Sequence, residues 1–161
     1  MNSRPSSEKL FQLKKIMRVR VTKAHRAYSE KLIDWKKLKQ KYDDLQTQVE
    51  ALQAELDKVV DYQVHNKNHR DTWVRKEASD RRHWVIYDQD LAVYKRNAAR
   101  SNLDEATTEL NMCKAAWLRA QHKEKTIGEQ GELALTAEAL IQEELQESEV
   151  EDLPMPGVSI A

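Results

Sequence analysis

The chain has 161 residues, is highly charged, and contains few residues that break helices. Asp, Glu, Lys and Arg make up 34% of it, whereas it holds only three Gly and three Pro, with none of either between residues 6 and 127. This composition excludes a turn-rich β fold and favours an all-α protein whose apolar residues form stripes along helices. A disordered polar chain is the alternative, but such chains lack the regular apolar spacing described below.

The net charge of zero conceals a division of charge along the chain. Residues 1–125 hold all 27 Lys and Arg and 18 of the 27 acids, whereas residues 126–161 hold the other nine acids and no basic residue. The first 41 residues alone contain thirteen Lys and Arg against three acids. The two regions therefore carry electric fields of opposite sign.

A short leader, residues 1–7, precedes the first predicted helix, with Ser6 or Ser7 available as its N-cap. From residue 8 onward two seven-residue ladders run in parallel, three and four residues apart, and thirteen of their sixteen positions are apolar. Such spacing predicts a helix packed along its length against another. The ladders are Leu10, Met17, Ala24, Lys31, Leu38, Leu45, Leu52, Val59 and Lys14, Val21, Tyr28, Trp35, Tyr42, Val49, Leu56, Gln63.

A turn is predicted within residues 65–80, where both ladders have stopped. Asn66, Asn68, Asp71 and Thr72 are good turn formers, and Ser79 with Asp80 could cap the second helix. His65 and His69 stand one helical turn apart, a spacing that suits a metal pair. No third ligand is evident nearby, so polar turn residues are the favoured interpretation and we expect no metal site.

The second predicted helix has two apolar series that differ in phase, with a slip between Ala98 and Leu103. Cys113, the only cysteine, falls on the second series and is expected to be a small buried apolar residue. The first series is Trp84, Tyr87, Leu91, Tyr94, Ala98. The second is Leu103, Ala106, Leu110, Cys113, Trp117, Ala120, Ile127.

Gly128 and Gly131 are expected to interrupt this helix. Residues 128–161 then form an acidic helical segment and a loose tail, in which Leu133, Ala137, Leu140, Ile141, Leu145 make one apolar face. The predicted fold is thus a long antiparallel two-helix coiled-coil hairpin over residues 8–127 with a flexible acidic C-terminal tail.

Nothing in the sequence indicates an enzyme or a cofactor. A two-helix seam offers no concave site, and no Gly-rich phosphate loop, metal-spaced Cys pair or nucleophile elbow occurs. The basic first segment resembles that of a DNA-binding zipper, but Met17 and Val21 continue the apolar seam through it, so it cannot lie alone in a groove. Binding of RNA or of a membrane surface through the same charges stays open.

We expect this chain to bind other proteins. A two-helix seam is too narrow to bury every large aromatic ring, and rings left exposed can anchor a partner. Tyr42, Tyr87, Leu91 and Tyr94 lie near the middle of the predicted hairpin and could form an exposed anchor patch. No run of 18 apolar residues and no signal-peptide pattern is present, so we expect a cytoplasmic protein.

The layout resembles the central stalk proteins of type III secretion, the YscO-type proteins and their flagellar relative FliJ. The resemblance rests on the Leu-rich basic start from Leu10 to Arg26, the hairpin without breakers, the Trp-containing middle and the ending Ala-Ala-Trp-Leu-Arg-Ala-Gln-His-Lys-Glu-Lys125. It covers roughly residues 8–150. The longer acidic tail and the His, Asn and Trp residues near the turn depart from the family pattern.

The resemblance implies a virulence-associated protein-transport component that catalyses nothing itself. Its expected partners are the hexameric secretion ATPase, the cytoplasmic ring of the export gate and secretion chaperones, with no small-molecule substrate, at the cytoplasmic side of the inner-membrane apparatus. By position, the ATPase end would be Arg18, Arg20, Arg26, Lys123, Lys125, and the gate-facing surface Tyr42, Tyr87, Leu91, Tyr94. The alternative is a nucleic-acid or ribosome-associated helical hairpin, and a generic tether is a third possibility.

Overall fold

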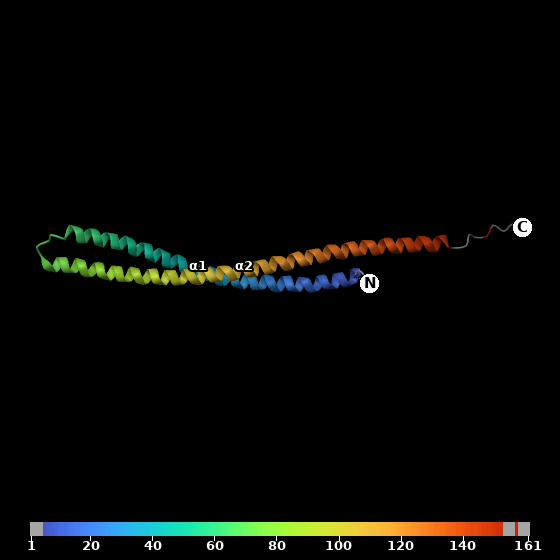
Figure 1. Ribbon diagram of the computed structural model, residues 1–161, viewed down its shortest axis with the longest axis horizontal. Helices are drawn as coiled ribbons and strands as arrows, with labels where there is room; N and C mark the ends of the chain where they lie inside the picture. Colours follow the sequence, from blue (N-terminus) through green and yellow to red (C-terminus); the bar gives the residue numbers. More distant parts are fainter. Residues whose placement is uncertain (1–4, 153–156, 158–161) are drawn as a thin grey trace. The chain divides into compact units, whose positions relative to one another are not determined.

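The computed structural model describes residues 5–152 and Gly157, and its elements are two helices. Helix α1 spans Ser7–His65 and helix α2 spans Thr72–Glu151 (Figure 1). Within the described residues there is no strand, so the predicted all-α helical hairpin is confirmed. The predicted leader falls partly, and the predicted loose tail after Asp152 almost wholly, outside the described residues.

The chain reverses direction between His65 and Thr72, inside the predicted range. The Asn66 side chain donates to the Tyr62 carbonyl at 2.8 Å and closes the end of α1. Asp71 is the N-cap of α2, because its Oδ1 accepts a hydrogen bond from the Trp73 amide at 2.9 Å. The predicted cap at Ser79 and Asp80 is wrong, since both residues lie inside α2. Asp71 is a stronger signal for the start of α2 than Ser79 or Asp80, because its side chain caps the helix.

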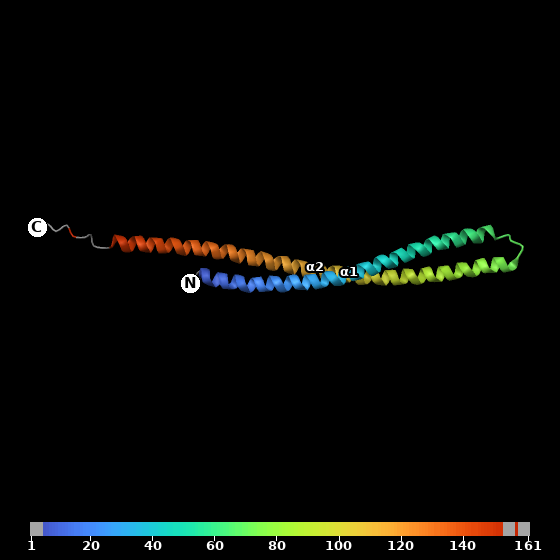
Figure 2. The same cartoon turned by 180° about the vertical axis from the view of Figure 1, so that it is seen from behind.

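The chain divides into two compact units, each built from one segment of α1 and one of α2. The turn unit is Tyr28–Cys113 and contains the reversal, whereas the terminal unit is Met1–Ala27 with Lys114–Ala161. In each unit the α1 segment and the α2 segment run side by side in opposite directions, and the view from behind shows the same pairing (Figure 2).

The seam of α1 follows the predicted ladders. Fifteen of the sixteen ladder positions are buried or half-buried, and only Lys31 is exposed. Leu10, Val49 and Val59 are the most deeply buried of them. Regular heptads of large apolar side chains therefore predicted the packed face of this helix correctly.

The first predicted series of α2, from Trp84 to Ala98, is out of phase with the seam, whereas the second series, from Leu103 onward, lies on the seam as predicted. Its buried positions there are Ala78, Val85, Ala92 and Ala99, seven residues apart. The same heptad continues through Ala106 and Cys113, both half-buried, so no slip occurs between Ala98 and Leu103. Small Ala side chains occupy the seam, and the larger rings beside them stay outside.

Polar residues share the alternate seam positions of α2 in the turn unit with Leu103 and Leu110. Gln89 pairs with Gln53, and Arg96 donates to the Gln46 side-chain oxygen at 3.3 Å. Trp35 donates its indole N–H to Thr107 Oγ1 at 2.9 Å. These contacts fix the register of α1 against α2 along this unit, because each one links a particular residue on each helix.

The predicted helix break at Gly128 and Gly131 is also wrong, because α2 continues through both to Glu151. Both glycines are buried against α1 in the terminal unit. A Cβ on Gly128 would lie 3.0 Å from Lys14 Nζ, and one on Gly131 would lie 3.3 Å from the Phe11 ring. The two glycines thus make room for α1 side chains, which offsets their low helix propensity of about 1 kcal/mol each.

Candidate partner-binding surfaces

The five basic residues expected at the ATPase end all belong to the terminal unit. Antiparallel pairing brings residues 18–26 of α1 alongside the region of α2 that contains Lys123 and Lys125. Arg18 Nε lies 3.2 Å from Glu124 Oε1, and His25 and Trp117 have ring centroids 4.7 Å apart. The structure therefore gathers these charges, although about a hundred residues separate them in sequence.

The basic residues surround the helix pair instead of forming one flat patch. Successive side chains of an α-helix turn by about 100°, so Arg18 and Arg20 leave α1 on opposite flanks and Arg26 points away from the seam. All three are exposed. Lys125 lies 4.0 Å from Glu129 one turn later on α2. Exposed ion pairs of this kind contribute little to stability, about 0–1 kcal/mol, and leave the charges accessible to a partner.

A second surface, the aromatic stripe, runs along α2 of the turn unit. We define it as Trp84, Tyr87, Leu91 and Tyr94, whose spacing places them on one side of the helix. Three of these side chains are largely exposed: 69% for Trp84, 61% for Tyr87 and 73% for Tyr94. The Trp84 and Tyr87 rings meet edge to face with centroids 6.4 Å apart. This row of exposed rings is typical of surfaces that bind other proteins.

Tyr42 does not belong to this stripe. It is half-buried in the α1 seam, with the Lys39 ammonium 5.6 Å from the centre of its ring. It precedes Gln46 by one turn, and Gln46 pairs with Arg96. Of the four residues expected to face the export gate, the structure thus brings Tyr87, Leu91 and Tyr94 together and leaves Tyr42 in the seam.

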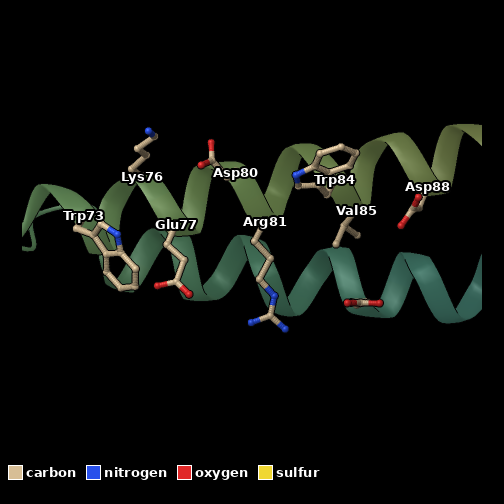
Figure 3. Close-up of a pocket in the computed structure, with 9 residues that line it drawn as sticks. Trp73, Lys76, Glu77, Asp80, Arg81, Trp84, Val85 and Asp88 are labelled. Carbon is tan, nitrogen blue, oxygen red and sulfur yellow. The ribbon is translucent and has the colours of Figure 1, made fainter.

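The stripe extends toward the turn through Trp73, which the sequence reasoning did not assign to a site. Trp73 and Trp84 are eleven residues apart, about three helical turns, so they share a side of α2. They flank a groove of about 620 Å³ that also includes Glu55 of α1. Figure 3 shows Lys76, Glu77, Asp80 and Arg81 in the row between the two indoles. The eleven-residue spacing of Trp73 and Trp84 is visible in the sequence, but the apolar spacing of α2 predicted Trp84 in the seam and so hid this surface.

One ion pair links the helices within the turn unit close to Cys113. Lys31 Nζ lies 2.7 Å from Glu109 Oε2, and this hydrogen bond raises the pKa of Lys31 above its ordinary value. Lys31 is the exposed member of the α1 ladder. At this ladder position the Lys31–Glu109 ion pair, at the edge of the seam, takes the place of an apolar contact. Cys113 itself is half-buried on the seam.

Metal-ligand clusters and membrane-spanning helices are absent from the described part of the chain. No group of three or more His, Cys, Asp or Glu side chains there could hold a metal ion. His65 donates through Nδ1 to the Asp61 carbonyl at 2.7 Å, and the His69 ring accepts from the Asp71 amide at 3.1 Å, so both rings take part in the turn. No helix in residues 5–152 is long and apolar enough to cross a membrane.

Comparisons with protein-family models, with curated proteins and with solved structures found no match for this chain.

Proposed function

We propose that this chain is a non-enzymatic central stalk of a type III secretion system, which couples the secretion ATPase ring to the export gate during protein export. The observation that carries the proposal is the combination of a two-helix hairpin with two separate surfaces of different chemistry. One is the set of basic residues in the terminal unit, and the other is the aromatic stripe in the turn unit.

The terminal unit suits an ATPase ring because its charges point in several directions. Arg18, Arg20 and Arg26 leave α1 on different sides, so a ring that encloses the helix pair could meet a basic side chain on each face. Exposed charges of this kind guide association and select among partners more than they add affinity. An asymmetric charged shaft can favour one ring position at a time, without catalysis of its own.

The aromatic stripe suits the export gate because it supplies apolar anchors, and it belongs to the turn unit, whereas the basic residues belong to the terminal unit. Tyr and Trp side chains dominate the energetics of many protein interfaces, and three exposed rings lie within eleven residues here. A chain that couples the ATPase to the export gate needs two surfaces that these partners can occupy independently. Secretion chaperones remain a further class of partner for the same stripe.

The test uses the full-length chain with purified secretion ATPase and, separately, the cytoplasmic domain of the export gate. Reversing Arg18, Arg20 and Arg26 together to Glu is expected to weaken ATPase binding about tenfold or more and to leave gate binding unchanged. The matched control reverses Lys36, Lys37 and Lys41, exposed bases of α1 in the turn unit. Equal loss in both variants would mean that net charge, and not this surface, sets the affinity.

The stripe is tested by replacing Tyr87 and Tyr94 with Ser. Gate binding is expected to fall by about thirtyfold or more, because exposed aromatic anchors each contribute about 1 kcal/mol or more to binding. Met112→Ser is the control, since Met112 is as exposed on α2 of the same unit but outside the stripe. Gate binding that survives the double change would contradict the assignment.

The second candidate is a nucleic-acid or ribosome-associated protein, favoured by the same exposed arginines. RNA binding through phosphate contacts weakens steeply with salt, with a slope that reports the number of phosphates contacted. A steep salt-dependent affinity for RNA, together with no binding to either secretion component, would favour this candidate.

A further inference from the structure

The acidic end of α2 carries an apolar surface that the stalk proposal does not use. In the terminal unit Ser7, the first residue of α1, contacts Glu138 of α2, and α2 continues for a further thirteen residues. Leu140, Ile141 and Leu145 in this continuation are each more than half exposed. Among the described residues, no hydrogen bond or ion pair joins α1 to α2 beyond Glu138.

The exposed side chains continue the heptad seam of α2. Ile127, Gly131, Ala134 and Glu138 are buried or half-buried against α1, and the next positions in the same spacing are 141 and 145. An apolar groove of about 700 Å³, which includes Leu10, Leu133 and Ile141, lies where α1 begins. The seam is therefore still apolar where α1 no longer covers it. We call Leu133, Ala137, Leu140, Ile141 and Leu145 the acidic-end face.

The charge beside this face is negative without interruption. No Lys or Arg follows Lys125, whereas Glu144, Glu147 and Glu151 flank the exposed leucines on the same helix. A partner that covers the face must bring an apolar stripe, and positive charge beside it would be favoured.

About the first five turns of α1 present such a surface on the same unit. Leu13, Ile16 and Val19 are exposed on one flank of α1, away from the seam. Three exposed basic residues share that flank, namely Lys9, Arg20 and Lys23. We call these six residues the basic-start face. Arg18 lies on the other flank, toward Glu124.

We propose that the acidic-end face binds the basic-start face of a second copy of this chain. Each copy offers both faces in its terminal unit, so a two-fold axis forms the same contact twice and closes the assembly at two copies. The two α1 starts and the two α2 ends then form a four-helix contact that buries the exposed Leu and Ile side chains. This inference does not depend on the secretion function, and it needs no other protein.

The first measurement is the mass of the full-length chain in solution across a concentration series, by sedimentation equilibrium at low and high salt. A dimer that dissociates on dilution, and whose dissociation constant rises about tenfold or more between 50 and 500 mM NaCl, is expected because the contact pairs acidic and basic residues. A monomer at all concentrations and at low salt overturns the proposal. A trimer, or an assembly that grows with concentration, overturns it as well.

Substitutions distinguish this contact from other routes to a dimer. Ile141→Glu combined with Leu145→Glu is expected to weaken the dimer by about a hundredfold or more, because two apolar side chains lose their burial and two negative charges are added. Leu135→Glu is the control. Leu135 is 52% exposed and Ile141 is 55% exposed, but Leu135 lies on the opposite flank of the same acidic segment. Equal weakening by both variants overturns the proposal.

Charge exchange tests the pairing directly. Reversing Lys9, Arg20 and Lys23 to Glu is expected to weaken self-association. Mixing that variant with a second variant, in which Glu144, Glu147 and Glu151 are changed to Lys, is expected to restore association, because both contacts of the mixed dimer then pair opposite charges. A mixture no tighter than either variant alone overturns the proposal, provided that circular dichroism shows both variants helical.

Cross-linking between two different single-cysteine chains locates the contact. One chain carries Ile16→Cys and the other Ile141→Cys, both in a Cys113→Ser background, and they are mixed under mild oxidation. A disulfide-linked heterodimer that forms faster than either linked homodimer supports the proposed pairing. Homodimers that form as fast as the heterodimer overturn it.

Discussion

Glu138 of α2 holds the first residue of α1. Its Oε1 accepts a hydrogen bond from the Ser7 amide at 2.8 Å and its Oε2 accepts one from Ser7 Oγ at 2.5 Å. The first amides of a helix have no partner inside the helix, and a carboxylate is favourable beside that positive end. Ser6 adds a second contact, because its Oγ accepts from the Lys9 amide at 3.4 Å. One residue of α2 therefore determines where α1 begins to pair.

Replacing Glu138 by Gln is expected to loosen the start of α1 while the rest of the hairpin stays folded. An amide side chain keeps the size but removes the charge, and it offers only one accepting oxygen to the two donors of Ser7. Hydrogen exchange should become faster in residues 7–13 and remain unchanged in residues 45–60. Glu143→Gln, an exposed acid of the same segment, is the control, and equal acceleration by the control would contradict the assignment.

The same contact predicts a pH dependence. The hydrogen bonds from Ser7 lower the pKa of Glu138 below its ordinary value of 4.5, because they favour the ionised carboxylate. A group with a lowered folded pKa contributes stability above its unfolded pKa and loses it as pH falls through the folded value. Protection of residues 7–13 from exchange should thus be constant from pH 7 to about pH 5 and decline below the ordinary value. Glu138→Gln should lack this decline.

The buried glycines of α2 predict an unusual stabilising substitution. Gly128→Ala adds a Cβ near Lys14 Nζ and Cε, the flexible end of a side chain that can move aside. The gain in helix propensity, about 0.5–1 kcal/mol, should therefore appear as a higher midpoint in urea unfolding.

Gly131→Ala provides the comparison. Its Cβ would press against the Phe11 ring at 3.3 Å, and a ring has less freedom to move than a lysine end. A smaller gain than at Gly128, or a loss, is expected in the same urea experiment. A larger gain at Gly131 would show that α1 and α2 are not packed as described.

The corrected phase of α2 can be tested with two adjacent alanines. Ala99 is 5% exposed on the seam, whereas Ala98 is exposed. Ala99→Glu buries a charge without a partner and should cost about 2 kcal/mol or more of unfolding free energy. Ala98→Glu should change it by less than about 0.5 kcal/mol, as most surface substitutions do. The reverse order in chemical denaturation would restore the phase first expected from the aromatic spacing.

The sequence predicted α1 better than α2 for a definite reason. Along α1 large apolar side chains occupy the seam, so the hydrophobic spacing and the buried face coincide. Along α2 of the turn unit the seam uses Ala78, Ala92 and Ala99 with Gln89 and Arg96, while Trp84, Tyr87 and Tyr94 lie outside. A pattern weighted by side-chain size therefore followed the wrong face and required a slip to rejoin the true one.

The candidate surfaces were also predicted only in part from the sequence. Antiparallel return alone brings Arg18 and Lys123 into one unit, so that juxtaposition needed only the position of the turn. The exposure of Tyr87, Leu91 and Tyr94 agrees with the reasoning that a two-helix seam cannot cover every ring. The separation of Tyr42 from them, and the extension through Trp73, required the actual phase of each helix.

The different side-chain sizes in the two seams of the turn unit determine which substitutions each helix tolerates. Helix α1 fills the interface with large side chains, mainly Leu, Val and aromatic rings, while three of the four buried residues of α2 in this unit are Ala. Shrinking a side chain should therefore harm α1 and be mild on α2, whereas enlarging one should harm α2 more than α1. A saturation mutagenesis scan would show two helices with opposite size preferences, a signature from which their facing residues could be paired without any structure.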